Sequence, residues 1–286
     1  GMYSTFMLPN CSENSKERLS QICEAIKRIY ASTFFQGAKA IMDTIIHRHE
    51  EEKMAVIIME LVGQEYNGNF YPTFSGVAQS YNYYPVSYME RQEGIVFIAS
   101  GLGKTIAEGE RSLRFSPYYP NILPQYYSIK STIENTQNNF YSLSLNDGKN
   151  PMDYGEEKNL KSLPLDIAEK DNQLKYLASV LCSEDDIVRD SLNHIGQRII
   201  TGAPLLKYDA FPLNDIIKFL LKIGENALGC PAEIEFAVNI NNDDLMEFAL
   251  LQIKPMVIET LINKNNFIKK DSDNTICYSK NVLGNG

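Results

Sequence analysis

The sequence predicts an α+β fold in which a mixed or antiparallel sheet is flanked by helices on one face. Apolar residues recur at helical spacing within residues 16–30 and again after Pro212, which is the pattern of amphipathic helices. Short apolar runs bounded by polar turns occur at residues 54–62, 74–84 and 94–100, which is typical of strands. Helical and strand patterns therefore alternate irregularly along one chain, as α+β folds require.

Composition excludes several classes of protein before any motif is considered. The 286 residues are 44% hydrophobic, enough to bury a core without a disulfide or metal framework. The net charge of -9 argues against nucleic-acid binding, which needs a basic face. Apolar runs fall short of the roughly 18 residues of a membrane span, so no membrane partner is expected. Five scattered cysteines without a C-x-x-C pair indicate a reducing, cytoplasmic location.

The amino-terminal part predicts two helices and a buried strand. Asn14, followed three residues later by Glu17, is a plausible cap for a helix over residues 16–30. A second helix is expected over residues 34–46. The run at 54–62 is apolar except for one glutamate, and its length favours a buried strand.

The middle of the chain has weaker periodicity. Residues 116–175 are rich in Asn, Ser, Pro and Tyr, so we expect long loops or a lid-like excursion there. Residues 171–193 are expected to be mostly helical, and residues 197–201 to form a strand.

The carboxyl-terminal part predicts a helix and a hairpin. Pro212 opens an apolar helical stripe and Gly229 stands where a left-handed cap would end it. Two strands follow at residues 233–238 and 248–253, with a polar turn at 241–244 between them.

This hairpin gathers polar side chains on one face, because side chains alternate along a strand. A turn centred between residues 243 and 244 puts Glu235 opposite Gln252 and Glu233 opposite Lys254. Two carboxylates, an amide oxygen and an ammonium together suit Mg²⁺ and a nucleotide phosphate. The alternative is a half-exposed hairpin with an ordinary Glu–Lys cross-strand pair, and spacing alone leaves both open.

Two other segments have a functional and a structural interpretation. The turn Ser100-Gly101-Leu102-Gly103-Lys104 follows an apolar run and could cradle phosphate through backbone N–H groups. It could equally be a tight strand-to-helix turn. Likewise, Val62-Gly63 could present backbone groups to a ring edge or simply end a strand.

Several segments in order along the chain resemble the ATP-grasp-type nucleotide-binding domain of phosphoenolpyruvate synthase and pyruvate phosphate dikinase. They include Ser75-Gly76-Val77, Gly101-Leu102-Gly103 and an acidic strand paired with Gln252-Ile253-Lys254-Pro255. The matching segments span residues 25–32, 54–62, 75–78, 101–109, 233–236 and 251–255.

The resemblance implies a domain organisation. Residues 2–258 would form a partial ATP-grasp-like domain, equivalent to the second half of that unit. Residues 259–286 would start a linker to downstream domains that this sequence lacks.

The resemblance also implies a site for ATP and Mg²⁺. Glu235 and Gln252 match the residues of the family that face metal and phosphate, with Glu233 as the acidic partner in place of Asp. Lys254 stands where the family has Arg, which keeps the charge but loses the bidentate fork. The backbone of Glu60-Leu61-Val62 matches the segment that meets adenine.

The activity implied by the resemblance is transfer of phosphate from ATP to a catalytic histidine, from which a separate domain passes it to pyruvate. This sequence has no Thr-His-x-x-x-Cys motif, no Arg-Ser-Ser stretch and no glycine-rich phosphate loop of that family. We therefore expect the fragment alone to be inactive and its partners to be a nucleotide, the swivelling phosphohistidine domain of the full-length chain and, through missing domains, pyruvate. The alternatives are a related dikinase acting on a glucan or antibiotic, and a non-catalytic nucleotide-binding or regulatory module.

Overall fold

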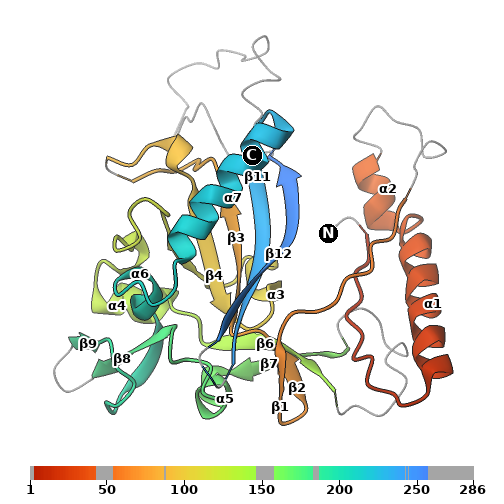
Figure 1. The fold of residues 1–286 in the computed structure, drawn as a ribbon, viewed down its shortest axis with the longest axis horizontal. Coiled ribbons are helices and arrows are strands. Elements are labelled where there is room, and N and C mark those ends of the chain that lie inside the picture. Colours follow the sequence, from red (N-terminus) through yellow and green to blue (C-terminus); the bar gives the residue numbers. More distant parts are fainter. Residues whose placement is uncertain are drawn as a thin grey trace, which may run out of the picture.

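The computed structural model describes residues 3–42, 54–86, 88–145, 158–182, 187–241, 243 and 245–256. In these residues the chain forms three antiparallel sheets with flanking helices (Figure 1), which confirms the predicted α+β class. The central sheet has five strands, in the spatial order β12 (Met246–Pro255), β11 (Ala232–Ile240), β3 (Phe74–Gln79), β4 (Ile95–Ser100) and β5 (Leu113–Phe115).

Two smaller sheets complete the strand layer. One has the order β1 (Gln64–Tyr66), β2 (Asn69–Tyr71), β6 (Asn139–Ser144) and β7 (Leu160–Pro164), and the other has β10 (Gln197–Ile200), β8 (Ala178–Cys182) and β9 (Ile187–Arg189). The turn between β1 and β2 is Asn67-Gly68, and both residues have positive φ, 49° and 79°. This is the combination that a tight two-residue hairpin requires.

Seven α-helices lie within the described residues, together with 3-10 turns at Arg91–Glu93 and Pro124–Tyr126. The helices are α1 (Ser15–Ser32), α2 (Gln36–Met42), α3 (Lys104–Ala107), α4 (Ile129–Asn135), α5 (Leu165–Lys170), α6 (Ala203–Leu206) and α7 (Leu213–Leu228).

Helix α7 covers one face of the central sheet (Figure 1). Leu213, Ile217 and Leu221 are buried along it and join the core with Phe236 of β11. Gly229 ends the helix in the left-handed conformation, with φ of 68° and its N–H bonded to the Glu225 carbonyl at 2.8 Å, as predicted. The covered face of the sheet is therefore a closed hydrophobic core.

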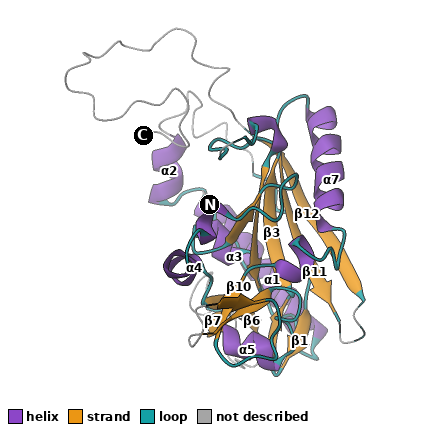
Figure 2. Ribbon diagram, turned by 90° about the vertical axis from the view of Figure 1, so that its left-hand side faces the viewer, coloured by secondary structure: helices purple, strands orange, loops and turns teal. Residues whose placement is uncertain are grey.

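The opposite face of the central sheet is open toward the amino-terminal helices. Helices α1 and α2 lie beyond β12 (Figure 1), and α2 and α7 lie on opposite sides of the sheet in the perpendicular view (Figure 2). Asn14 caps α1 as predicted, because its side chain accepts the Lys16 N–H at 3.0 Å. Glu17 does not complete a capping box; its carboxylate accepts the Ser12 hydroxyl instead.

The prediction of a buried strand at residues 54–62 is wrong. These residues form no helix or strand, and Ile57 and Ile58 are 76% and 66% exposed. A strand needs a neighbour to pair its backbone groups, and no described strand pairs with this segment. Residues 56–62 line a cavity instead, and Leu61 among them also packs against the core.

Two further predictions are wrong for the described residues. The segment 116–175 is not a set of long loops, since it contains α4, β6, β7 and α5 and buries Phe140, Leu143 and Leu165. Residues 171–193 contain β8 and β9 rather than a helix. In the first region β6 pairs with β2, far back along the chain, a signal that local periodicity does not carry. In the second, β8 and β9 are short strands that pair with each other. The predicted linker, 259–286, lies outside the described residues.

Substitution of Gly76 tests the packing between β3 and β11. Gly76 pairs with Phe236, whose ring occupies the place of a Cβ at Gly76 and stacks on Phe248 at 5.0 Å. Gly76→Ala forces this buried ring to move, so we expect a loss of about 1–3 kcal/mol in the free energy of unfolding, measured by urea denaturation. Gly37→Ala is the control, because nothing lies within 4 Å of its added Cβ. An unchanged midpoint for Gly76→Ala would contradict the packing described.

The lowered pKa of Asp190 predicts how the stability of the fold changes at low pH. Partial burial raises the pKa of this carboxyl, but hydrogen bonds from Lys207, Ser179 and Tyr208 outweigh it, so the pKa is held below the ordinary 3.8. A carboxyl with a lowered pKa stabilises the fold above its unfolded pKa and loses that effect as pH falls through the folded value. Wild type should therefore exceed Asp190→Asn in melting temperature at neutral pH, and the gap should close below pH 3.8.

Candidate functional site

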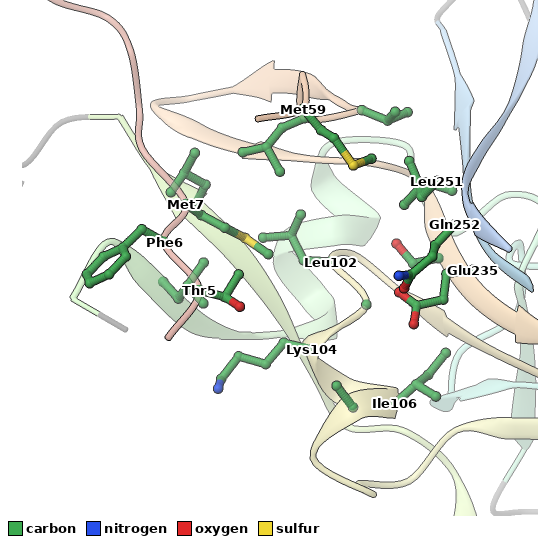
Figure 3. Close-up of a pocket in the computed structure, with 18 of the residues that line it drawn as sticks. Thr5, Phe6, Met7, Met59, Leu102, Lys104, Ile106, Glu235, Leu251 and Gln252 are labelled. Carbon is green, nitrogen blue, oxygen red and sulfur yellow. The ribbon is translucent and has the colours of Figure 1, made fainter. Parts of the chain in front are cut away.

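A cavity of about 2170 Å³ lies between the open face of the central sheet and the amino-terminal part of the chain (Figure 3). Residues 3–11, one side of α1, residues 56–62 and the strands β3, β11 and β12 contribute to its walls. All the residues predicted from the sequence to bind nucleotide or metal line it, namely Glu60, Leu61, Val62, Glu233, Glu235, Gln252 and Lys254.

A row of side chains crosses the open face of the sheet from one edge to the other. The strand registers place Gln252, Glu235, Val77, Phe97 and Arg114 side by side on five successive strands, and all five line the cavity. Neighbouring strands are about 4.8 Å apart. Glu235 therefore lies roughly three strand spacings from Arg114, and the apolar side chains of Val77 and Phe97 stand between them.

The hairpin register near the polar group is the predicted one. Glu233 pairs with Lys254 and Glu235 pairs with Gln252. Beyond this point Phe236 pairs with Leu250, so Leu251 is an extra residue in a β-bulge. The sequence placed Leu251 on the face opposite Gln252, whereas the bulge lets both side chains line the cavity (Figure 3).

Lys254 binds both carboxylates of the hairpin. Its Nζ lies 2.7 Å from Glu233 Oε1 and 2.8 Å from Glu235 Oε1. Partial burial lowers the pKa of Lys254, but the hydrogen bonds to Glu233 and Glu235 outweigh this effect and leave the pKa raised above 10.5. The ammonium is therefore charged at neutral pH and bridges the two acids.

Gln79 is a site residue that the sequence analysis missed. Its Nε2 donates to Glu233 Oε2 at 2.6 Å, so both oxygens of Glu233 have partners. Gln79 lies two residues after Val77 on β3 and pairs with Glu233 in the register. Strand alternation beyond the Ser-Gly-Val motif would have placed it on the cavity face.

The oxygen atoms left uncommitted suit a hard metal ion. No hydrogen bond from the described residues reaches Glu235 Oε2 or the Gln252 amide, and the two side chains lie together at the cavity wall (Figure 3). No group of three or more His, Cys, Asp and Glu side chains in the described part of the chain could hold a metal. A carboxylate oxygen and an amide oxygen could hold Mg²⁺, which commonly takes one or two protein oxygens and completes its shell with phosphate and water.

The glycine-rich turn after β4 is built as a structural turn. Gly101 has φ of 77°, and its N–H and that of Leu102 bond to the carbonyls of Thr73 and Tyr141. Two of its N–H groups are therefore not available to a phosphate. Lys104, at the start of α3, pairs with Glu108 at 3.0 Å and lies 5.6 Å from the centre of the Tyr141 ring.

The comparison with protein families decides the identity of this fold. The family described as "pyruvate phosphate dikinase, AMP/ATP-binding domain" matches residues 1–274 of the chain. The chain belongs to this family. No curated protein sequence matches it.

Membership of the pyruvate phosphate dikinase AMP/ATP-binding domain family means that the chain belongs to a family of nucleotide-binding phosphotransferase domains. It confirms the family resemblance carried by the sequence motifs. In this member no helix of the described residues has the length and apolar character to cross a bilayer.

The hydrogen bond between Gln79 and Glu233 gives the first test of the site. Glu233 is only 16% exposed in its side chain, so Gln79→Leu leaves a mostly buried carboxylate oxygen without its donor. We expect a loss of about 1 kcal/mol in the free energy of unfolding, since hydrogen bonds to charged groups contribute on that order when partly screened. Urea denaturation measures it, and equal stability of the variant would show that the bond does not hold Glu233.

Proposed function

We propose that this pyruvate phosphate dikinase AMP/ATP-binding domain binds ATP with Mg²⁺ in the cavity, with the phosphates at the β11–β12 hairpin. The observation that carries this proposal is the pairing of Glu235 with Gln252. Both side chains line the cavity and both keep oxygen atoms that no described residue uses. An ordinary Glu–Lys pair on a half-exposed hairpin would not need this second pair beside it.

Each hairpin residue has a role in this proposal. Glu235 and Gln252 hold Mg²⁺, while Lys254 places a positive charge beside the phosphates and Glu233 holds Lys254. When bound, Mg²⁺ would neutralise charge on the phosphate oxygens, which is the main requirement of phosphoryl transfer. Lys254 acts as a point charge on a flexible stem, unlike the planar fork of an arginine.

The adenine would lie against the backbone of Glu60, Leu61 and Val62. No backbone–backbone hydrogen bond from the described residues involves these three, so their N–H and C=O groups are available to the edge of a ring. They line the same cavity as the hairpin, and Leu61 also packs against the core. A segment that is fixed by packing but unpaired in its backbone can read a polar ring edge.

The wider activity is a proposal that rests on the family. The domain would supply ATP to a phosphotransferase that phosphorylates a catalytic histidine on the way from pyruvate to phosphoenolpyruvate, in the cytoplasm. The histidine would lie on a swivelling domain of the full-length chain. Extending the reading frame tests this: a downstream Thr-His-x-x-x-Cys motif and an upstream Arg-Ser-Ser stretch would support it, and stop codons on both sides would contradict it.

Calorimetry with MgATP tests the site itself. We expect the double variant Glu235→Ala with Gln252→Ala to lose at least tenfold in affinity, since it removes both proposed metal ligands, and the heat of binding measures this. Arg114→Gln is the matched control, because it removes charge from the far end of the same row of side chains. Equal binding by wild type and the double variant, or no binding by wild type, would refute the hairpin assignment.

If Arg114→Gln lost affinity and the double variant kept it, the phosphates would lie at the β5 edge instead. This control therefore tests the direction of the nucleotide in the cavity as well as the specificity of the first result.

A further inference from the structure

The cation between the two hairpin carboxylates is the side chain of Lys254. Its Nζ lies 2.7 Å and 2.8 Å from one oxygen of each carboxylate. A magnesium ion bound to these oxygens would be about 2.0–2.1 Å from each. An ion at that distance would place a second cation against the same two oxygen atoms, and like charges so close repel each other. Lys254 in its observed position and a metal on these two oxygens therefore compete.

We propose that Lys254 is a built-in counter-ion that fills the cation site of the free domain and competes with a divalent metal for it. A metal ion that takes the two oxygens bonded to Lys254 must then displace the ammonium from two charge-assisted hydrogen bonds. A metal that arrives with a nucleotide brings phosphate oxygens, which offer the ammonium a new anionic partner. The second half of this exchange rests on the proposed function, whereas the first half rests on the hairpin alone.

The contacts around Glu233 hold the counter-ion in place. Glu233 Oε1 accepts from Lys254, and Glu233 Oε2 accepts from Gln79 at 2.6 Å. Glu233 is mostly buried, and Lys254 stands directly opposite it in the register of the hairpin. In the free domain both oxygens of Glu233 are therefore occupied by hydrogen bonds, one of them from Lys254, and Glu233 is not available as a metal ligand.

Glu235 has fewer hydrogen bonds than Glu233 and is more exposed, as expected of a carboxylate that exchanges one cation for another. Only its Oε1 is bonded to Lys254, and its side chain is 38% exposed. Withdrawal of the ammonium would leave this carboxylate next to the Gln252 amide with no other partner in the described chain. A lysine can make such a movement because its ammonium is a compact charged group on a flexible stem of four carbons.

Manganese binding followed by electron paramagnetic resonance tests the competition without nucleotide or catalysis. We expect Lys254→Met to bind Mn²⁺ at least tenfold more tightly than wild type, because it removes the competing cation and leaves two carboxylates without a counter-charge. Lys130→Met is the matched control: Lys130 is 85% exposed, on α4, and its loss changes net charge equally without touching the hairpin. The control should bind Mn²⁺ like wild type.

Equal or weaker Mn²⁺ binding by Lys254→Met would overturn the proposal. Circular dichroism checks that each variant is folded. If Lys254→Met does not fold, Lys254→Gln repeats the test with a polar side chain. Because the polar side chain also removes the charge, the expected result is the same.

Repeating the titration with a non-hydrolysable ATP analogue separates this inference from the proposed function. The analogue should raise the Mn²⁺ affinity of wild type at least tenfold and that of Lys254→Met much less. If the variant binds bare Mn²⁺ more tightly but the analogue binds neither protein, the competition stands and the nucleotide site fails. If the analogue binds both proteins and bare Mn²⁺ affinity is unchanged by the substitution, the nucleotide site stands and the counter-ion role fails.

Discussion

The backbone pairing of β11 with its two neighbours is the constraint on which the rest of the site depends. β11 bonds to β12 on one side and to β3 on the other, so its register decides what Glu233 and Glu235 face. A slip of one residue would turn both carboxylates toward α7 and the core. The bulge at Leu251 lies between the turn and the polar pairs. On its turn side Phe236 pairs with Leu250, so without the extra residue Glu235 would face Leu251 instead of Gln252.

Charge balance at the hairpin explains why the polar group is tolerated on a half-buried sheet. Two carboxylates on alternate positions of one strand repel each other, and Glu233 is mostly buried. Lys254 from the neighbouring strand and Gln79 from the strand on the other side supply the compensating donors. The same arrangement leaves Glu235 Oε2 and the Gln252 amide at the wall of the cavity without a hydrogen bond from the described residues.

Local patterns located the strongly periodic elements and missed those held by distant partners. Helices α1 and α7, with the caps at Asn14 and Gly229, were predictable because capping and helical period are local properties. Strand β6 pairs with β2, far back along the chain, so a window of sequence does not reveal that pairing. Strands β7, β8 and β9 pair with strands nearer in sequence, but they are short and their periodicity is weak. The segment 54–62 has the composition of a strand, but composition does not supply the neighbour that a strand needs.

The sequence by itself determined the fold class and the family. It also predicted the facing of Glu233 with Lys254 and of Glu235 with Gln252, because side chains alternate along a strand and a short turn restricts a hairpin to few registers, whereas the bulge that gives this register came from the structure. Only the tertiary structure decided the role of Gln79, which depends on β3 lying beside β11. It also decided that residues 60–62 and the hairpin share one cavity. Both contacts join segments more than 150 residues apart, and their proximity depends on how the sheet and the amino-terminal part of the chain pack.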